Sequence, residues 1–302
     1  TIKTVNKDIF LNGKSIFLKG ISVHDENPFA EGRLRSEGDM RMILNWAKDL
    51  GCNYIRLAHY THNETMLRLA DEVGLLVWAE VPVYWTISWT NNETFKNASN
   101  QLKVGIERDK NRASIIIWSV GNETPVTEER NVFMGNLVDL ARNTDDTRLI
   151  AAALEVERHG YTVTVEDSLG DKLDLASFNE YGGWYWSDAK ELPKYSFDIK
   201  FNKPVVISEF GAGALAGFHG DEDTMWSEEY QELIYINQLE MLDKMDGLRG
   251  MTPWILVDFK SPRRQNPVFQ NFWNRKGLLS NTGKKKKAYY ILQNYYNNKT
   301  MD

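Results

Sequence analysis

Two glutamates follow buried, β-branched segments of this sequence, and their positions suggest carboxylate chemistry. Residues 115–124 read IIIWSVGNET, and residues 203–210 read KPVVISEF. Continuous apolar runs bounded by turn residues are typical of strands that are covered on both faces. The first strand delivers Asn122 and Glu123 at its end, and the second delivers Glu209. Because a carboxylate is costly to desolvate unless a partner or a reaction requires it, both glutamates are candidate reacting groups.

A pair of carboxylates, one protonated and one ionised, can hydrolyse a glycosidic bond through an oxocarbenium-like transition state. A hydrophobic setting for Glu123 predicts a raised pKa and the role of general acid, because burial disfavours the charged form. Glu209 is expected to stay ionised as the nucleophile if Arg56 and Tyr181 lie near it. Asn122 can donate to a sugar 2-hydroxyl, an interaction that strengthens in the transition state.

Other hydrolytic chemistries fit the sequence less well. Metal-dependent hydrolysis needs closely spaced ligands, and the five histidines form neither an HxH nor an HExxH motif. A serine nucleophile would call for an elbow such as GxSxG, which the sequence lacks. The single cysteine, Cys52, excludes an intrachain disulfide, and its position before a strand predicts a buried apolar side chain. We therefore expect no metal and no cofactor.

The composition is that of an ordinary globular domain. Of 302 residues, 42% are hydrophobic and 26% are charged, which is enough for a large core. The formal net charge of -6 argues against binding to nucleic acid or to an anionic membrane, and no apolar run is long enough to span a membrane. The tract KKKK at 284–287 precedes AYYILQNYY, which predicts a solvated first turn of the last helix. The oligomeric state and the compartment do not follow from the sequence.

Eight candidate strands alternate with helical patterns along the chain. The strands are expected at residues 15–24, 52–60, 75–82, 114–122, 149–155, 173–179, 203–210 and 248–259. Helical patterns fill most of the gaps, whereas the gaps after the fifth and sixth strands are weaker and richer in Gly, Asp and Tyr. Eight such units in about 250 residues fit an α/β fold, the (β/α)8 TIM barrel. A doubly wound sheet is the alternative, but neither GxGxxG nor GxxxxGK[ST] is present.

In such a barrel the active site lies at the carboxyl ends of the strands. The groups expected there are His24 with Asp25 and Glu26, Arg56 with His59, Glu80, Asn122 with Glu123, Asn179 with Glu180 and Tyr181, Glu209, and Trp254 with Asp258. Acidic, amide, imidazole and aromatic groups at so many strand ends indicate a functional pocket.

Several motifs, in this order along the chain, resemble those of glycoside hydrolase family 2. They are IRLAHY, WSVGNE, FNEYGGWYW, VVISEFG, AGFHGDEDTMWSEEYQ and WNRKG, and the likeness covers nearly the whole chain. Within that family the chain is most similar to the catalytic barrel of the β-glucuronidases, and DTMWSEEYQ is a specific part of the match. The resemblance implies a retaining exo-glycosidase that hydrolyses terminal β-D-glucuronides by double displacement.

Residue by residue, the resemblance implies Glu123 as acid/base and Glu209 as nucleophile, with Tyr181 beside the nucleophile. It places these side chains around the sugar: His24, Arg56, His59, Asn122, Asn179, Tyr185 and Trp254. It also assigns Asn274 and Lys276, an Asn-x-Lys pair, to the carboxylate of a uronic acid. An ammonium and an amide donor make charge-assisted hydrogen bonds to a carboxylate, and a neutral hexose would leave the ammonium unpaired.

The sequence also departs from the family. Members often carry Arg-His-Glu after the first strand, whereas residues 23–26 read VHDE. The segment KSPRRQNPVFQNF at 260–272 brings Arg263 and Arg264 toward the pocket mouth, as part of a leaving-group site or as a loop decoration. Trp85 and Trp89 could stack on a leaving-group sugar. A non-proline cis peptide bond after residue 254 is a further expectation from the likeness.

Family enzymes carry a jelly-roll domain and an immunoglobulin-like domain before the barrel. We therefore expect residues 1–302 to form a single catalytic barrel domain, with residues 1–14 as an entry segment from a preceding β-sandwich. A β-galactosidase or β-galacturonidase of the same family is the alternative function, because Asn-x-Lys does not distinguish galacturonate from glucuronate. An inactive sugar-binding barrel and a scaffold protein are more remote alternatives. A carbohydrate is the expected partner of the enzyme.

Overall fold

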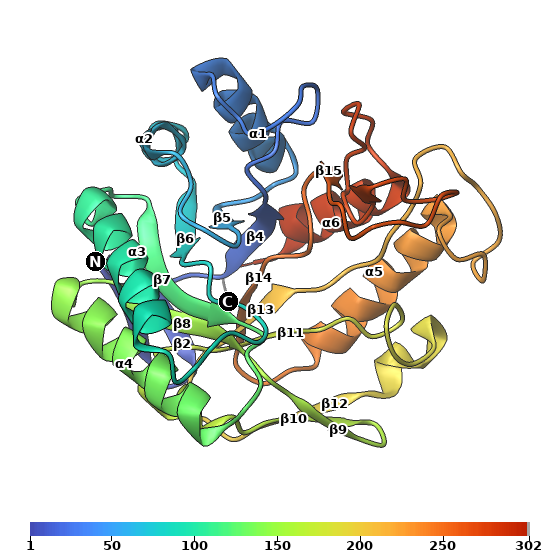
Figure 1. Cartoon of the computed structure of the whole chain (residues 1–302). Helices are drawn as coiled ribbons and strands as arrows, with labels where there is room; N and C mark the ends of the chain where they lie inside the picture. Colours follow the sequence, from blue (N-terminus) through green and yellow to red (C-terminus); the bar gives the residue numbers. More distant parts are fainter. Residues whose placement is uncertain (301–302) are drawn as a thin grey trace.

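The computed structural model describes residues 1–300, and its centre is a closed barrel of eight parallel strands (Figure 1). Around the barrel the strands follow the order β11-β13-β14-β4-β5-β6-β7-β8. Their bounds are β4 Leu18–Val23, β5 Tyr54–Leu57, β6 Leu76–Glu80, β7 Ile115–Asn122, β8 Leu149–Leu154, β11 Ala176–Asn179, β13 Val205–Glu209 and β14 Leu248–Met251. Each expected strand overlaps one of these eight, so the predicted TIM barrel is confirmed.

The α-helices lie outside the strands (Figure 1). Their bounds are α1 Glu37–Asp49, α2 Glu64–Val73, α3 Asn92–Asp109, α4 Glu128–Thr144, α5 Glu228–Asp243 and α6 Lys287–Asn298. Helix α2 shows how the sequence sets both ends: Asn63 accepts a hydrogen bond from the Thr65 N–H, and Gly74 adopts a left-handed φ of 71°. Glycine meets the least steric cost in that conformation, so the helix ends there and the chain turns into β6.

The connections after β8 and β11 contain no α-helix in the described structure. They hold the 3-10 helices η1 (Ser168–Lys172) and η2 (Ala189–Lys194), and a small sheet of β9 (Glu157–His159), β10 (Thr162–Val165) and β12 (Ser196–Ile199). Short 3-10 turns need no long apolar period, which accounts for the weak helical patterns there. The eighth expected strand was too long, because β14 ends at Met251 and the chain then continues as a loop.

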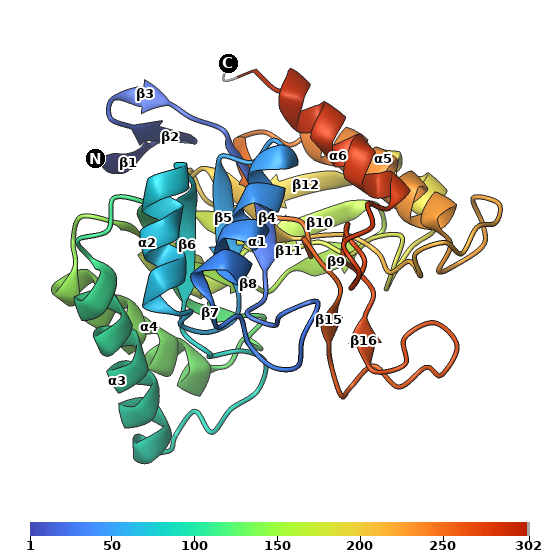
Figure 2. The ribbon, with the colours of Figure 1, turned by 90° about the horizontal axis from the view of Figure 1, so that it is seen from above.

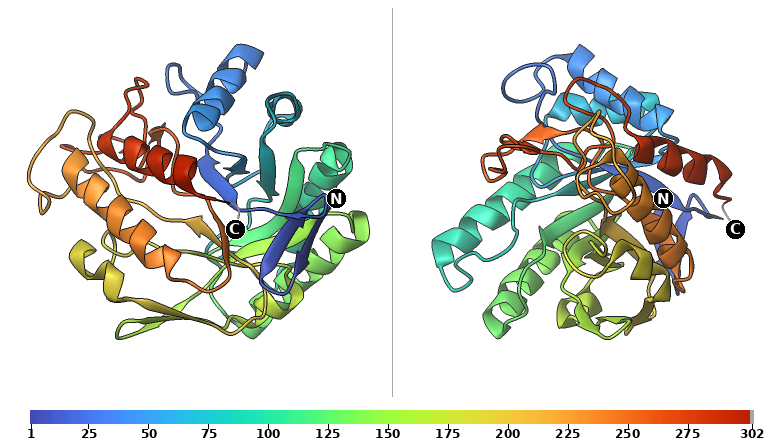
Figure 3. Two further views of the ribbon diagram at one scale, coloured as in Figure 1. Left: turned by 180° about the vertical axis from the view of Figure 1, so that it is seen from behind. Right: turned by 90° about the vertical axis from the view of Figure 1, so that its right-hand side faces the viewer.

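An antiparallel sheet of β1 (Ile2–Val5), β2 (Asp8–Leu11) and β3 (Lys14–Ser15) precedes the barrel. Ile9 of this sheet is fully buried and packs with Leu18, Tyr54 and Trp78 of the barrel strands. Figure 3 shows the sheet from behind, and Figure 2 shows it at the end of the molecule opposite the hairpin of β15 (Phe259–Lys260) and β16 (Trp273–Asn274). The loops that carry the candidate site therefore lie at the other end of the barrel.

The lysine tract differs from its prediction. Helix α6 begins at Lys287, and Lys286 before it is fully buried, with its ammonium donating to Asp258 at 2.8 Å. The interpretation as a solvated first turn was wrong for Lys286 because a buried carboxylate pairs with it. Cys52 is buried, as predicted. Within residues 1–300, none of the helices has the length and apolar character needed to cross a membrane.

Candidate active site

A cavity of about 500 Å³ lies among the residues that follow the barrel strands. Ten of the twelve predicted site residues line it: His24, His59, Asn122, Glu123, Tyr181, Tyr185, Glu209, Trp254, Asn274 and Lys276. The other two, Arg56 and Asn179, are buried behind this lining. A concave site of this volume is large enough for one sugar ring and part of a leaving group.

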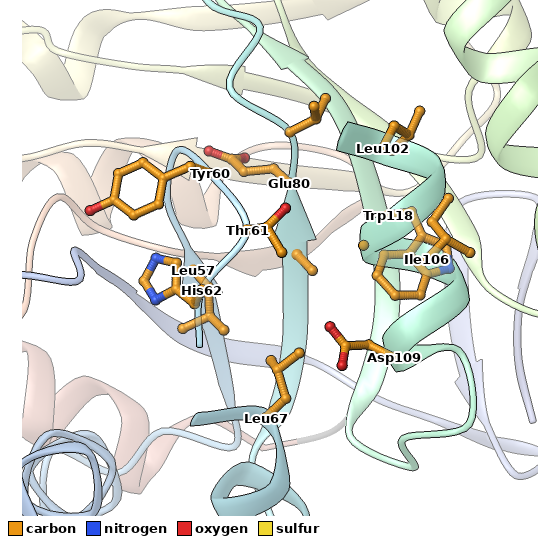
Figure 4. A pocket seen from close by; sticks show the side chains of 13 residues that line it. Leu57, Tyr60, Thr61, His62, Leu67, Glu80, Leu102, Ile106, Asp109 and Trp118 are labelled. Carbon is orange, nitrogen blue, oxygen red and sulfur yellow. The ribbon is translucent and has the colours of Figure 1, made fainter. Parts of the chain in front are cut away.

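A second cavity lies between strands β5 and β6 and helix α3, and Figure 4 shows its lining. Its volume is only about 20 Å³, which is room for about one water molecule and too little for a sugar. His62, Glu80 and Asp109 contribute polar groups to its wall. In the described part of the chain, however, no group of three or more His, Cys, Asp or Glu side chains is arranged to hold a metal ion. The 500 Å³ cavity, which gathers ten of the predicted site residues, is therefore the candidate active site.

Glu209 ends β13, and its carboxylate is held from two sides. Arg56 Nη1–H donates to Oε1 at 2.9 Å, and the Tyr181 hydroxyl donates to Oε2 at 2.6 Å. Burial raises the pKa of Glu209, although Arg56, His59 and Tyr181 act in the opposite direction. The structure thus brings Arg56 and Tyr181 beside Glu209, as expected, and both favour its ionised form against the effect of burial.

The charge of Arg56 is shared between Glu209 and a second carboxylate. Its buried guanidinium also donates to Glu80, from Nε to Oε2 at 3.1 Å and from Nη2 to Oε1 at 3.2 Å. Burial alone would raise the pKa of Glu80, but Arg56 and His59 lower it to about 2. One guanidinium cannot neutralise two carboxylates, so Glu209 keeps part of its desolvation cost. Glu80 was expected among the groups at the strand ends but not around the sugar, and the structure places it behind the cavity as a partner of Arg56.

Glu123 follows directly after β7 and is only half-buried. Its φ of 50° is uncommon outside glycine and is found at functional sites more than elsewhere. The Trp85 indole N–H donates to Glu123 Oε2 at 3.0 Å. The predicted hydrophobic setting is therefore wrong, because the turn takes the carboxylate out of the apolar strand to an indole donor and partial solvent exposure.

The orientation of the Asn122 amide is fixed by two donors. Arg56 Nη2–H and Asn179 Nδ2–H donate to Asn122 Oδ1 at 2.8 and 3.1 Å. With its oxygen occupied, the NH2 group of Asn122 lies toward Glu123, at 3.4 Å from Oε2. Ser208 in turn donates to Asn179 Oδ1 at 2.7 Å. Arg56 and Asn179 were expected around the sugar, but they lie behind the wall and position Asn122 instead.

Stacked imidazole and aromatic rings form one wall of the cavity. His59 stacks on Trp254 with ring centroids 4.8 Å apart, and His24 stacks on Phe259 at 4.2 Å. His24 Nδ1 also contacts the Glu26 carboxylate. The peptide bond after Trp254 is cis, as expected from the likeness. Flat rings of this kind suit the apolar face of a sugar.

Lys276 is the buried cation of this cavity. Its side chain donates to the Tyr185 hydroxyl at 2.7 Å, and Nζ lies 4.6 to 5.4 Å from the ring centroids of Tyr181, Trp184 and Tyr185. Burial lowers the pKa of this ammonium. Among residues 1–300 it forms no ion pair with a carboxylate. Asn274 Oδ1 accepts the Lys276 backbone N–H at 3.1 Å, which leaves the Asn274 NH2 group for the cavity.

The chain as a whole matches a known catalytic domain. A model described as Glycosyl hydrolases family 2, TIM barrel domain, matches residues 2–300. The chain belongs to glycoside hydrolase family 2.

Similar members of glycoside hydrolase family 2 include a β-glucuronidase of Paenibacillus borealis, 28% identical over 319 residues that cover 97% of this chain and 51% of that protein. A solved structure of a β-galacturonidase from Eisenbergiella tayi bound to galacturonate has a TM-score of 0.87 and 27% identity, over 99% of this chain and 54% of that one. The solved structure of the β-D-glucuronidase of Dictyoglomus thermophilum has a TM-score of 0.88 and 25% identity, over 99% of this chain and 54% of that one. The chain spans about half the length of these relatives.

In this family 2 barrel, two of the acids found at strand ends are structural. Lys286 donates to Asp258 Oδ1 at 2.8 Å and to the Arg275 carbonyl at 3.0 Å, while Asp258 Oδ1 also accepts the Gly277 N–H at 2.9 Å. A Cβ at Gly277 would lie 2.2 Å from the Asp258 nitrogen, so only glycine allows this approach. These contacts hold the turn that presents Lys276. Glu180 is buried and accepts the Gly182 N–H at 2.6 Å, away from the cavity.

Of the two tryptophans expected near a leaving group, Trp85 lines the cavity of the family 2 barrel and Trp89 does not. Trp89 packs edge-to-face on Phe133 with centroids 5.3 Å apart, because helices α3 and α4 provide apolar cover there. Arg263 and Arg264 line the cavity mouth, so segment 260–272 reaches the site.

Proposed function

We propose that this chain is the catalytic domain of a retaining exo-glycosidase that hydrolyses terminal β-D-glucuronides. The observation that carries the sugar assignment is Lys276, a buried ammonium that faces the same cavity as Glu209 and has no carboxylate partner among residues 1–300. A buried cation without an anion is costly, and the carboxylate of a bound uronic acid would offset that cost. The likeness to family 2 β-glucuronidases supports the same assignment.

In the proposed mechanism Glu209 attacks the anomeric carbon while Glu123 protonates the leaving-group oxygen. The bond to the leaving group breaks, and a covalent glycosyl-enzyme forms on Glu209. Glu123, now ionised, takes a proton from water as the water attacks the same carbon, which releases the sugar with retained configuration. This double displacement calls for a carboxyl separation of about 5 to 5.5 Å. The Tyr181 and Arg56 hydrogen bonds orient the Glu209 oxygens for attack.

The contacts around the sugar follow from the lining. Lys276 and Asn274 donate to the uronate carboxylate, and the Asn122 NH2 group donates to the 2-hydroxyl, where the interaction strengthens in the transition state. His24, His59 and Trp254 provide the wall against the ring. A second candidate, β-galacturonidase, is favoured by the likeness to the Eisenbergiella tayi enzyme bound to galacturonate. The two uronic acids differ at one hydroxyl and share the carboxylate.

The deciding experiment compares hydrolysis of four matched chromogenic substrates: β-glucuronide, β-galacturonide, β-galactoside and β-glucoside. Glu209→Gln serves as the blank. We expect a signal on the glucuronide that is at least about tenfold above the others, because a neutral sugar leaves the ammonium unpaired. Preference for the galacturonide would favour the second candidate, and preference for a neutral sugar would overturn the role of Lys276. NMR of the first-formed anomer tests retention, and an inverted product would exclude the double displacement.

A further inference from the structure

Trp85 and Arg263 meet on the rim of the cavity and are not among the reacting groups of the proposed mechanism. Trp85 lies between β6 and α3, and Arg263 lies between β15 and β16, yet the guanidinium carbon is 4.6 Å from the centroid of the indole ring. Both residues line the same cavity as Glu123. Figure 2 shows the loop between β15 and β16 projecting at the open end of the barrel.

Where Trp85 and Arg263 lie relative to the two candidate catalytic glutamates indicates which part of a substrate they contact. Trp85 donates its indole N–H to Glu123 Oε2 at 3.0 Å. In the proposed mechanism Glu123 protonates the leaving-group oxygen, so groups bound to Glu123 surround the leaving group. Lys276, by contrast, lies against the ring of Tyr181, whose hydroxyl donates a hydrogen bond to Glu209. In the proposed mechanism Glu209 contacts the sugar that is released, so Lys276 lies on the side of that sugar. Trp85 and Arg263 therefore lie on the leaving-group side.

The charge of Arg263 is available to a ligand. Arg263 is exposed, and within residues 1–300 no carboxylate forms an ion pair with it. Its neighbour Lys260, on the same rim, is paired with Glu31 at 3.1 Å, and the rim carboxylate of Glu26 contacts His24. The guanidinium carbon lies over the Trp85 indole, and the planar guanidinium fork matches a carboxylate or a sulfate.

We propose that Arg263, positioned by Trp85, binds an anionic group on the leaving group, so that the natural substrate is an acidic oligosaccharide with a terminal uronic acid. The inference rests on the proposed function, because it uses Glu123 to define the leaving-group side. The anion is a carboxylate or a sulfate on the sugar next to the cleaved bond. Arg263 then selects the leaving group, whereas Lys276 selects the sugar that is released.

The test uses three glucuronosyl disaccharides whose reducing-end sugar is neutral, sulfated or carboxylated. In the intact protein at low salt, kcat/KM is expected to be about tenfold higher for an anionic disaccharide than for the neutral one, and the advantage shrinks as salt screens the exposed charge. Whichever of the sulfated and carboxylated disaccharides has the higher kcat/KM identifies the anion that Arg263 binds. Arg263→Gln should remove the preference through KM and leave the neutral disaccharide within about twofold.

Arg158→Gln is the matched control, because Arg158 is also exposed and lies 4.5 Å over an indole, that of Trp186, outside the cavity. It should keep the preference intact. Equal kcat/KM for all three disaccharides in the unmodified protein, or an unchanged preference in Arg263→Gln, would overturn this inference and leave the proposed function standing. Failure to hydrolyse any glucuronide, including the chromogenic one, would instead overturn both.

Discussion

Arg56 and Glu80 face each other in a two-point contact, with Nε–H donating to Oε2 at 3.1 Å and Nη2–H donating to Oε1 at 3.2 Å. Both side chains are buried. The contact leaves Nη1 of the guanidinium directed at Glu209, 2.9 Å away. The setting of the candidate nucleophile therefore depends on Glu80, a carboxylate that lies outside the main cavity.

Replacing Glu80 by Gln tests this dependence through stability. Removing one partner of a buried charge pair leaves the other uncompensated, so we expect the free energy of unfolding to fall by about 3 to 5 kcal/mol in urea titrations. Glu72→Gln is the control, since Glu72 pairs with Arg41 and Arg68 in an exposed network and should leave the urea midpoint nearly unchanged. Equal midpoints for both variants would contradict the structural role of Glu80.

Replacing Lys276 by Met separates recognition from bond cleavage. Loss of the ammonium should lower kcat/KM for a β-glucuronide by about 100-fold or more, because the sugar carboxylate then meets an apolar group. Any turnover of a β-glucoside should change little. Lys285→Met is the matched control, because Lys285 also lies over a tyrosine ring, that of Tyr289 at 4.4 Å, and does not line the cavity. A parallel loss on both substrates would show that Lys276 supports structure rather than recognition.

Replacing Tyr181 by Phe tests the second hydrogen bond to Glu209. A hydrogen bond to a charged group contributes about 1.5 to 3 kcal/mol, so kcat/KM should fall by roughly 10- to 100-fold. Since this bond lowers the pKa of Glu209, the acidic limb of the pH profile should also move to higher pH. Tyr161→Phe removes a hydrogen bond of the same 2.6 Å length to Glu191 on the surface and should alter neither quantity. An unshifted acidic limb would argue against the assignment of Glu209.

Glu180 predicts a pH dependence of stability. Burial raises its pKa from 4.5 to about 7, although the Gly182 N–H acts to lower it. The folded protein therefore holds this proton more tightly than the unfolded chain, so the stability contribution is complete below pH 4.5 and is lost as the pH rises through 7. The loss is about 3 kcal/mol. Glu180→Gln should remove this loss. If the free energy of unfolding changed with pH in the same way for both proteins between pH 4.5 and 8, the prediction would be refuted.

The sequence predicted the barrel and brought most of the site together because both depend on local patterns. Apolar strands and the acids that end them, such as Glu123 and Glu209, are visible without any knowledge of neighbours. The partners of those acids are not visible in this way. Arg56 and Glu80 meet because β5 pairs with β6 in one particular register, and Lys286 is buried because Asp258 comes back beside it from 28 residues earlier in the chain.

Loop geometry limited the rest of the prediction. The left-handed turn at Glu123 takes its carboxylate away from the strand that suggested burial, and no residue pattern announces such a turn. Trp85 and Trp89 lie four positions apart in similar surroundings, yet one reaches Glu123 and the other packs on Phe133. Which side of a loop faces a cavity is decided by packing against elements distant in sequence, which a single sequence does not reveal.

The turn that carries Asn274 and Lys276 follows the last barrel strand and is fastened by Asp258 and Lys286, whereas Glu123, Glu209 and their supports belong to the barrel itself. The turn and the barrel can therefore change independently during evolution. Under the proposed function, substitutions in this turn would change which sugar binds, whereas the buried charges around Glu209 would remain as they are. On that proposal, related barrels could differ in substrate through a few residues after the last strand and still share the buried groups around Glu123 and Glu209.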